Sequence, residues 1–359
     1  MEELTFTRRL TRLLVDNVNR FTSVYSYKQI IKWAGVKNKY KGKRVFLIAN
    51  GPSLNITPLY LLKDEYTIVF NRFNLMLERL NYHPTFYMLA DGLVGKDIKD
   101  DIVYFIEHSE KTFIPDISKG ERVNFRKMLP QNEKVMYMFE EPVYFSKMLP
   151  FVQSGNSVIF NAFQVLRYLG FSEIIVVGND MNHVLHDTVK VMNEENFKGS
   201  IKQDVKSQYD DDPNHFDPRY FGKGRVYHQP NKYEIQKIFD NLDVVAKEYK
   251  KSGTKVTNAG YNSRVECFPK QDFYECLGYS QDKIDSLFLD LIKSLGFDCI
   301  ESFIAKAIRK DEEWEECLEL VAVPSNSATT IIKKKVIEYL PIGPYKDFVY
   351  MINRKYLNE

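Results

Sequence analysis

The chain of 359 residues is long enough for one large domain or two modest ones. Apolar residues make up 44% of it and charged residues 27%, a globular composition that argues against wholesale disorder. Fifty Lys and Arg residues against 48 Asp and Glu leave a formal charge of +2, which does not favour tight nucleic-acid binding. No window approaches the ~18 to 20 consecutive apolar residues of a membrane span. With no secretory signal and four cysteines that lack metal-ligand spacing, the sequence predicts a soluble cytoplasmic protein without a disulfide framework.

Residues 1–40 form a predicted N-terminal helical segment. Leu10, Leu13, Leu14 and Val18 share one stripe at helical spacing, with arginines around it. Such a basic amphipathic helix either packs on its own domain or lies on an anionic membrane surface, and both interpretations stay open.

Residues 41–270 alternate short apolar strands with helices. The expected strands cover 45–49, 66–70, 85–90, 112–114, 173–177 and 255–257, and the expected helices cover 157–169 and 232–251. This order predicts an α/β fold, Rossmann-like and doubly wound, with a mostly parallel sheet. The polar stretch at about 181–226 shows no sustained periodicity and is predicted to be a lid insertion. Residues 271–359 are predicted to be a helical C-terminal region, with an amphipathic helix from Ser280 to Leu295.

The first apolar strand runs into a turn-forming cluster, Asn50, Gly51, Pro52 and Ser53. In open α/β sheets, ligands bind beyond the carboxyl ends of the strands. A glycine there lets the backbone approach a phosphate, and the Asn and Ser side chains can supply hydrogen bonds. The cluster matches neither GxGxxG nor the P-loop pattern, so a purely structural turn is the alternative.

Polar residues also follow three further strands and precede one helix, at Asn71, Asp91, Asp180, and Ser154, Gly155 and Asn156. The free N–H groups of a helix start favour an anion, although Asn156 or Ser157 could equally be an ordinary N-cap. Because several of these groups would converge on one crevice, the pattern predicts a binding site there.

His228 stands where the polar insertion rejoins the sheet domain, just before the long helix. A histidine at the mouth of a cleft is suited to taking a proton from a hydroxyl group, and a structural role is the alternative. His183 and His186 offer two metal ligands, too few for a zinc site. The run 210–212 of three aspartates could present carboxylates to a metal, but a solvated acidic loop is the expected interpretation.

Residues 45–54 resemble the opening nucleotide-binding motif of bacterial family-42 sialyltransferases. The same region is shared by the related motility-associated-factor flagellin glycosyltransferases and by the 6-hydroxymethylpterin diphosphokinase-like domain. Ser154-Gly155 with residues 169–180, and then residues 227–231, are similar to two later regions of the sialyltransferases. The resemblance covers roughly residues 44–268, in order.

The resemblance implies an inverting glycosyltransferase that needs no metal or other cofactor and uses a CMP-activated donor, such as CMP-sialic acid. It implies that Asn50 and Ser53 hold the nucleotide, that Asn71 lies near the donor, and that His228 is the general base. Ser154 and Gly155 would flank the donor, and Tyr209 or Tyr220 could donate a hydrogen bond to its phosphate. The implied partner is a glycan or glycolipid acceptor, and a membrane surface and a second copy of the chain stay open as partners.

The sequence also departs from the sialyltransferase pattern. Phe151 replaces an arginine, Ala90-Asp91 replaces an asparagine, and Asn182 replaces a tyrosine. These differences leave the sugar and the acceptor open and keep two alternatives. One is a Mg²⁺-dependent pterin or nucleotide diphosphokinase in which Asp91 and Asp180 bind the metal. The other is a non-catalytic nucleotide-binding scaffold.

Overall fold

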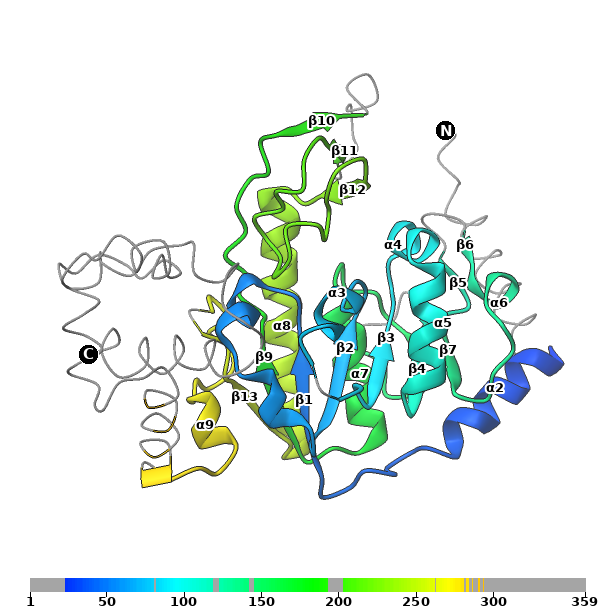
Figure 1. Cartoon of the computed structure of the whole chain (residues 1–359). Coiled ribbons are helices and arrows are strands. Elements are labelled where there is room, and N and C mark those ends of the chain that lie inside the picture. Colours follow the sequence, from blue (N-terminus) through cyan, green and yellow to red (C-terminus); the bar gives the residue numbers. More distant parts are fainter. Residues whose placement is uncertain are drawn as a thin grey trace. The chain divides into compact units, whose positions relative to one another are not determined.

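The computed structural model of the chain describes residues 23–80, 82–118, 123–141, 145–192, 203–261 and 263–280, with scattered positions up to 293. The chain forms two compact units (Figure 1). The β1 unit comprises Arg44–Pro84, Glu173–Asn231 and Lys255–Glu359, and the β4 unit comprises Met1–Lys43, Thr85–Ser172 and Lys232–Thr254. The predicted C-terminal helix and the stripe on residues 10–18 lie largely outside the described residues.

Four parallel strands form the sheet of the β1 unit in the order β13-β9-β1-β2, and they are β1 (Arg44–Ile48), β2 (Tyr66–Phe70), β9 (Glu173–Val177) and β13 (Lys255–Asn258). Strand β1 leads along the chain to its neighbour β2, whereas β9 leads to β13 on the other side. The direction of the connections therefore reverses between the adjacent strands β1 and β9. Such a reversal opens a crevice beyond the carboxyl ends of the strands, where ligands of α/β sheets bind.

Short apolar runs explain why these segments form buried strands. The last four residues of β1 and of β2 are fully buried, because both faces of a parallel sheet are covered. The helices of this unit are short: η1 (Pro52–Ile56), η2 (Leu59–Leu62), α3 (Asn74–Leu77) and α9 (Phe273–Cys276).

The predicted lid insertion contains a small antiparallel sheet, which the sequence analysis did not predict. Its strands pair in the order β10 (Val189–Val191), β11 (Gln203–Ser207) and β12 (Val226–Gln229). Val205 and Tyr227 are buried partners on β11 and β12, at 1% and 6% exposure. This sheet lies beyond the carboxyl ends of β1 and β2 (Figure 1). We call residues 203–229 the β11–β12 segment.

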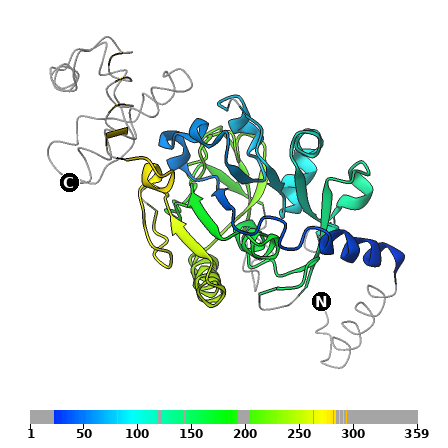
Figure 2. The ribbon, with the colours of Figure 1, turned by 90° about the horizontal axis from the view of Figure 1, so that it is seen from below.

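The β4 unit has its own four parallel strands in the order β3-β4-β7-β8, which are β3 (Phe86–Met88), β4 (Lys111–Pro115), β7 (Val135–Glu140) and β8 (Phe151–Val152). A short antiparallel pair, β5 (Ile117–Ser118) and β6 (Val123–Asn124), adjoins them in sequence. The helices are α2 (Val24–Ala34), α4 (Gly92–Asp97), α5 (Lys99–His108), α6 (Phe125–Met128), α7 (Val158–Leu169) and α8 (Lys232–Ser252), the last seen end-on in Figure 2.

The predicted α/β class with a mostly parallel sheet is confirmed in both units. The predicted helices at 157–169 and 232–251 are α7 and α8, and the expected strands match within two residues at each end. Strand β7 was missed, although Val135, Tyr137 and Phe139 are residue types enriched in strands. The boundaries at residues 40 and 270 stay predictions.

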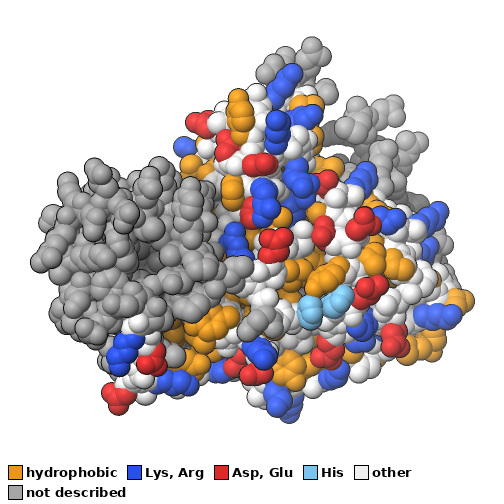
Figure 3. Space-filling model, in the orientation of Figure 1, with side chains coloured by type: hydrophobic (Ala, Val, Ile, Leu, Met, Phe, Trp, Pro, Cys, Tyr) orange, Lys and Arg blue, Asp and Glu red, His pale blue; other side chains and the backbone are white. Residues whose placement is uncertain are grey.

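Two surface features of the described residues bear on partners. No described helix is long and apolar enough to cross a membrane. Acidic and basic side chains are interspersed over the face shown in Figure 3, as the small formal charge of +2 leads one to expect.

Candidate functional site

Strand β1 ends in a turn that is tied to the residues following β9. The Gly51 amide donates a hydrogen bond to the Gly178 carbonyl at 2.8 Å. A Cβ atom on Gly51 would lie 2.5 Å from Asp180 Oδ2 and 2.6 Å from the Gly178 carbonyl oxygen, closer than real Cβ atoms approach. Glycine is therefore required here because the backbone itself packs against the neighbouring loop.

Asp180 caps the 3₁₀ helix η1 from the end of β9. Its carboxylate accepts hydrogen bonds from the Ser53 amide, at 2.8 Å, and from the Ser53 hydroxyl. Burial raises the pKa of Asp180, while the bonds from Ser53 and the charge of nearby His215 oppose that rise. The structure thus brings the predicted residues Ser53 and Asp180 together, at the strand reversal between β1 and β9.

Asn50 joins the same turn to the β11–β12 segment. Its side-chain amide donates to the Phe70 carbonyl at 3.2 Å and to the Tyr220 hydroxyl at 3.1 Å. The Asn50 carbonyl in turn accepts from the Phe216 amide at 3.0 Å. Asn50 Oδ1 is buried and has no hydrogen-bond partner among the described residues. A buried acceptor without a donor is costly, so this oxygen is suited to a polar ligand.

His228 lies on β12 directly opposite Asp204 on β11. Asp204 Oδ1 is hydrogen-bonded to His228 Nδ1, and 27% of the histidine side chain is exposed. A carboxylate at Nδ1 orients the ring and leaves proton transfer to Nε2, the arrangement used by catalytic histidines. The structure therefore places the predicted base in an Asp–His pair that the sequence did not reveal.

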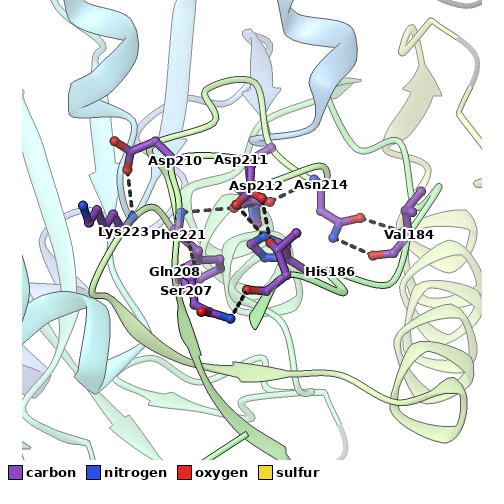
Figure 4. Close-up of polar contacts among 12 residues, drawn as sticks. Val184, His186, Ser207, Gln208, Asp210, Asp211, Asp212, Asn214, Phe221 and Lys223 are labelled. Carbon is purple, nitrogen blue, oxygen red and sulfur yellow. Dashed lines mark hydrogen bonds and ion pairs between the residues drawn. The ribbon is translucent and has the colours of Figure 1, made fainter. Parts of the chain in front are cut away.

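Two more histidines of the insertion are paired with aspartates. His186 is 3% exposed, and its Nε2 lies 2.9 Å from Asp211 Oδ1 (Figure 4). Its Nδ1 lies 2.7 Å from the Tyr227 hydroxyl. His215 Nδ1 lies 2.8 Å from Asp212 Oδ2. The buried His186 ring holds strand β12 to the Asp211 loop, which is a structural role.

Asp212 is a buried hub rather than part of a solvated acidic loop. Besides His215, it accepts from the amides of Asn214 at 2.9 Å and Phe221 at 3.1 Å (Figure 4). Burial alone would raise the pKa of Asp212, but the charge of His215 and these hydrogen bonds outweigh burial and lower it. The expectation of a solvated loop is thus wrong for Asp212, because the segment folds around its carboxylate.

The predicted residues of the β4 unit have local capping roles. Asp91 is the N-cap of α4 and accepts from the amides of Leu93 at 2.8 Å and Val94 at 3.0 Å. Gly155 and Asn156 adopt left-handed φ angles of 57° and 59° before Ser157, which is the N-cap of α7, as the alternative interpretation held. Ser154 starts that turn, since its carbonyl accepts from the Ser157 amide at 3.2 Å.

The remaining predicted residues of the β1 unit differ in their surroundings. Pro52 opens η1, and Asn71 follows β2 with a left-handed φ of 49°. Tyr220 is 2% exposed and contacts Asn50, whereas Tyr209 is 60% exposed and Asn182 is exposed as well. Of the two tyrosines, Tyr220 is therefore the one at the Asn50 turn.

Sequence reasoning did not single out Asp204, expected Asp212 to lie in a solvated acidic loop, and gave no role to His215. The Asp–His spacing of three residues at 212–215, next to a proline, was a local signal that could have flagged the last two. Among the described residues, no group of three or more His, Cys, Asp or Glu side chains is arranged to hold a metal ion.

Residues 21–184 match the family model described as 6-hydroxymethylpterin diphosphokinase MptE-like. No curated protein matches the chain. Among solved structures, the MAf glycosyltransferase from Magnetospirillum magneticum AMB-1 is similar, with 14% sequence identity and a TM-score of 0.39. The similarity covers 92% of this chain and 54% of that protein, so the chain spans about half of its length. The match over residues 21–184 includes the Asn50–Ser53 motif and agrees with the predicted resemblance to the 6-hydroxymethylpterin diphosphokinase-like domain.

Proposed function

We propose that the protein is a glycosyltransferase that moves a sugar from a CMP-activated donor to a glycan or glycolipid acceptor, with inversion at the anomeric carbon. The Asp204–His228 pair is the observation that carries the proposal. With Nδ1 bonded to the carboxylate, Nε2 takes the proton of the acceptor hydroxyl as that oxygen attacks the anomeric carbon. The bond from that carbon to the donor phosphate breaks, and its electron pair leaves with CMP.

The donor binds, on this proposal, at the turn after β1. Gly51 keeps the turn packed against Gly178 and Asp180, and the buried Asn50 Oδ1 accepts a hydrogen bond from the donor. The Tyr220 hydroxyl lies beside Asn50 and is within the same polar cluster. CMP is already a good leaving group, so the protein has to orient the reactants, supply hydrogen bonds to the departing phosphate and remove the acceptor proton.

The test measures CMP binding and sugar transfer separately in each variant. His228→Ala should leave CMP affinity intact by calorimetry while lowering transfer by roughly 10²-fold to 10⁴-fold. Asp204→Asn should lower transfer by at least about 10-fold, because the ring then loses its charged orienting partner. His108→Ala, on the exposed end of α5, is the matched control. Full transfer activity in His228→Ala would refute the assignment of the base.

The family description favours one other function, a Mg²⁺-dependent diphosphokinase. The aspartates it would use are already engaged: Asp180 accepts from Ser53, and Asp91 caps α4. Because both aspartates are occupied in this way, the diphosphokinase is the second candidate function. If ATP with Mg²⁺, but not CMP, raises the melting temperature and EDTA abolishes activity, the diphosphokinase replaces the glycosyltransferase.

A further inference from the structure

His215 is a further carboxylate-bound histidine, and it lies in the loop between β11 and β12, whereas His228 lies on β12. In register, Asp204 pairs with His228 two positions beyond the Lys206–Val226 pair, whereas His215 lies in the loop between the two strands. The two imidazoles therefore occupy different places in the segment and need separate roles.

The ring of His215 is fixed in plane and in rotation. It stacks on the Tyr220 ring, with centroids 3.8 Å apart and planes 2° from parallel, and the Phe221 ring meets it edge-on at 5.2 Å. Asp212 Oδ2 lies 2.8 Å from Nδ1, and 23% of the histidine side chain is exposed. A ring held at one nitrogen and along one face presents Nε2 in a fixed direction.

Contacts to the turn after β1 locate this ring. Tyr220, on which His215 stacks, accepts a hydrogen bond from the Asn50 side chain. The neighbouring residue Phe216 is bonded at both ends, since its amide donates to Asn50 and its carbonyl accepts from Asn55 Nδ2 at 2.9 Å. The charge on His215 also reaches Asp180, which caps the same turn.

Two buried polar atoms around this ring await a partner. Asn50 Oδ1 and His183 Nε2 are both buried without a hydrogen bond among the described residues. Asn214 joins the loop of His183 to that of His215, because its side chain accepts from the Val184 amide at 2.7 Å and donates to the Val184 carbonyl at 2.8 Å (Figure 4). Burial, and next the charge of His215, lower the pKa of His183, which keeps that second ring neutral beside the first. Unsatisfied buried groups of this kind mark a place for a polar ligand.

We propose that His215, positioned by Asp212, serves the departing phosphate of the donor and acts as a general acid. The inference rests on the proposed glycosyl transfer. In this step His215 starts as the imidazolium, opposite the Asp212 carboxylate. As the bond between the anomeric carbon and the phosphate oxygen breaks, its electron pair moves to that oxygen, and the Nε2 proton of His215 moves to it and leaves a neutral ring. His228 meanwhile gains the acceptor proton, so the enzyme holds the same number of protons before and after. The charge on the phosphate would thereby be met by this chain's own donors.

The experiment separates the donor side of the reaction from the acceptor side. Release of CMP from CMP-sialic acid is measured without acceptor, together with CMP affinity by calorimetry and the melting temperature. His215→Ala should slow this release by about 10²-fold and weaken CMP binding by about 10-fold. His228→Ala should lose more of its transfer to an acceptor than of its acceptor-free release. His108→Ala, remote in sequence and exposed, should match the wild type.

A second variant covers the case in which His215→Ala does not fold. His215→Gln keeps an N–H donor of similar reach but cannot give up a proton at neutral pH, so it should bind CMP and still release it slowly. Release within about twofold of wild type in a folded His215 variant would overturn the role of His215 alone. A wild type that neither binds CMP nor releases it would overturn the glycosyltransferase proposal as well.

Discussion

The buried carboxyl group of Asp180 caps the turn after β1, and the buried carboxyl group of Asp212 lies in the β11–β12 segment; the two behave differently. Asp180 and Asp212 are both 6% exposed. Asp180 is bonded to a neutral serine, and burial raises its pKa. Asp212 faces His215 and two amides, and its pKa is lowered despite burial. Equal burial therefore does not set the charge state; a cationic neighbour and the number of donors decide it.

The largest expected effect is at Asp212. Asp212→Asn removes the charge opposite His215 and should lower the free energy of unfolding by about 3 kcal/mol at neutral pH. Chemical denaturation measures it. Asp210→Asn is the control two residues away, since Asp210 is exposed and makes one bond, to the Lys223 amide at 2.7 Å. Equal losses in both variants would contradict a special role for the buried hub.

A substitution at Gly51 tests the packing of the turn after β1 against Asp180. A Cβ at this position meets Asp180 and the Gly178 carbonyl, so Gly51→Ala should cost about 2 kcal/mol and displace the Asp180 cap. Gly35→Ala is the matched control, since its nearest obstacle is a carbonyl at 3.4 Å. A neutral Gly51→Ala in denaturant unfolding would show that the turn can move away.

The two carboxyl groups should give stability profiles of opposite sign against pH. Because the folded pKa of Asp212 is lowered, its contribution is present above the ordinary value of 3.8 and is lost as pH falls through the folded pKa. The folded pKa of Asp180 is raised, so ionisation of Asp180 reduces stability as pH rises above 3.8. As the pH rises above 3.8, the Asp180→Asn variant should therefore become more stable than the wild type, by about 1 kcal/mol. A difference independent of pH would argue against the raised pKa.

The smallest expected effect concerns the third pair. Thr188 Oγ1 donates to Asp211 Oδ2 at 2.6 Å, and Asp211 is partly exposed. Thr188→Val should cost about 0.5 to 1 kcal/mol, because water can replace the lost donor. Thermal melting resolves a change of this size. A cost as large as that of Asp212→Asn would contradict the prediction that the partly exposed Thr188–Asp211 pair matters less than the buried Asp212–His215 pair.

The sequence predicts the local features of the β1 unit well. The apolar run at 45–49 and the turn residues after it are local signals, so strand β1 and the turn follow directly. The packing that requires glycine at position 51 does not, because it involves Gly178 and Asp180. The expectation that strand ends converge also places Ser53 beside Asp180, because parallel strands share one carboxyl edge.

The Asp–His pairs could not be predicted in the same way. Asp204 and His228 are 24 residues apart and meet through an antiparallel register that no local pattern fixes. Asp212 and His215 are close in sequence, yet the ring turns toward the carboxylate because Tyr220 supports its face. The first pair therefore depends on long-range strand pairing, whereas the second depends on the stacking of Tyr220, five residues further along the chain.

The side chain of Asn214 forms hydrogen bonds with both the amide and the carbonyl of Val184, as the backbone of a neighbouring strand would. A carboxylate at 214 would lose the donor and a hydroxyl would lose the reach, so few replacements can imitate it. Position 214 thus ties the loop that carries His183 to the loop that carries His215. A saturation library at position 214 would show which side chains still hold these two loops together, although Asn214 itself has no proposed role in the chemistry.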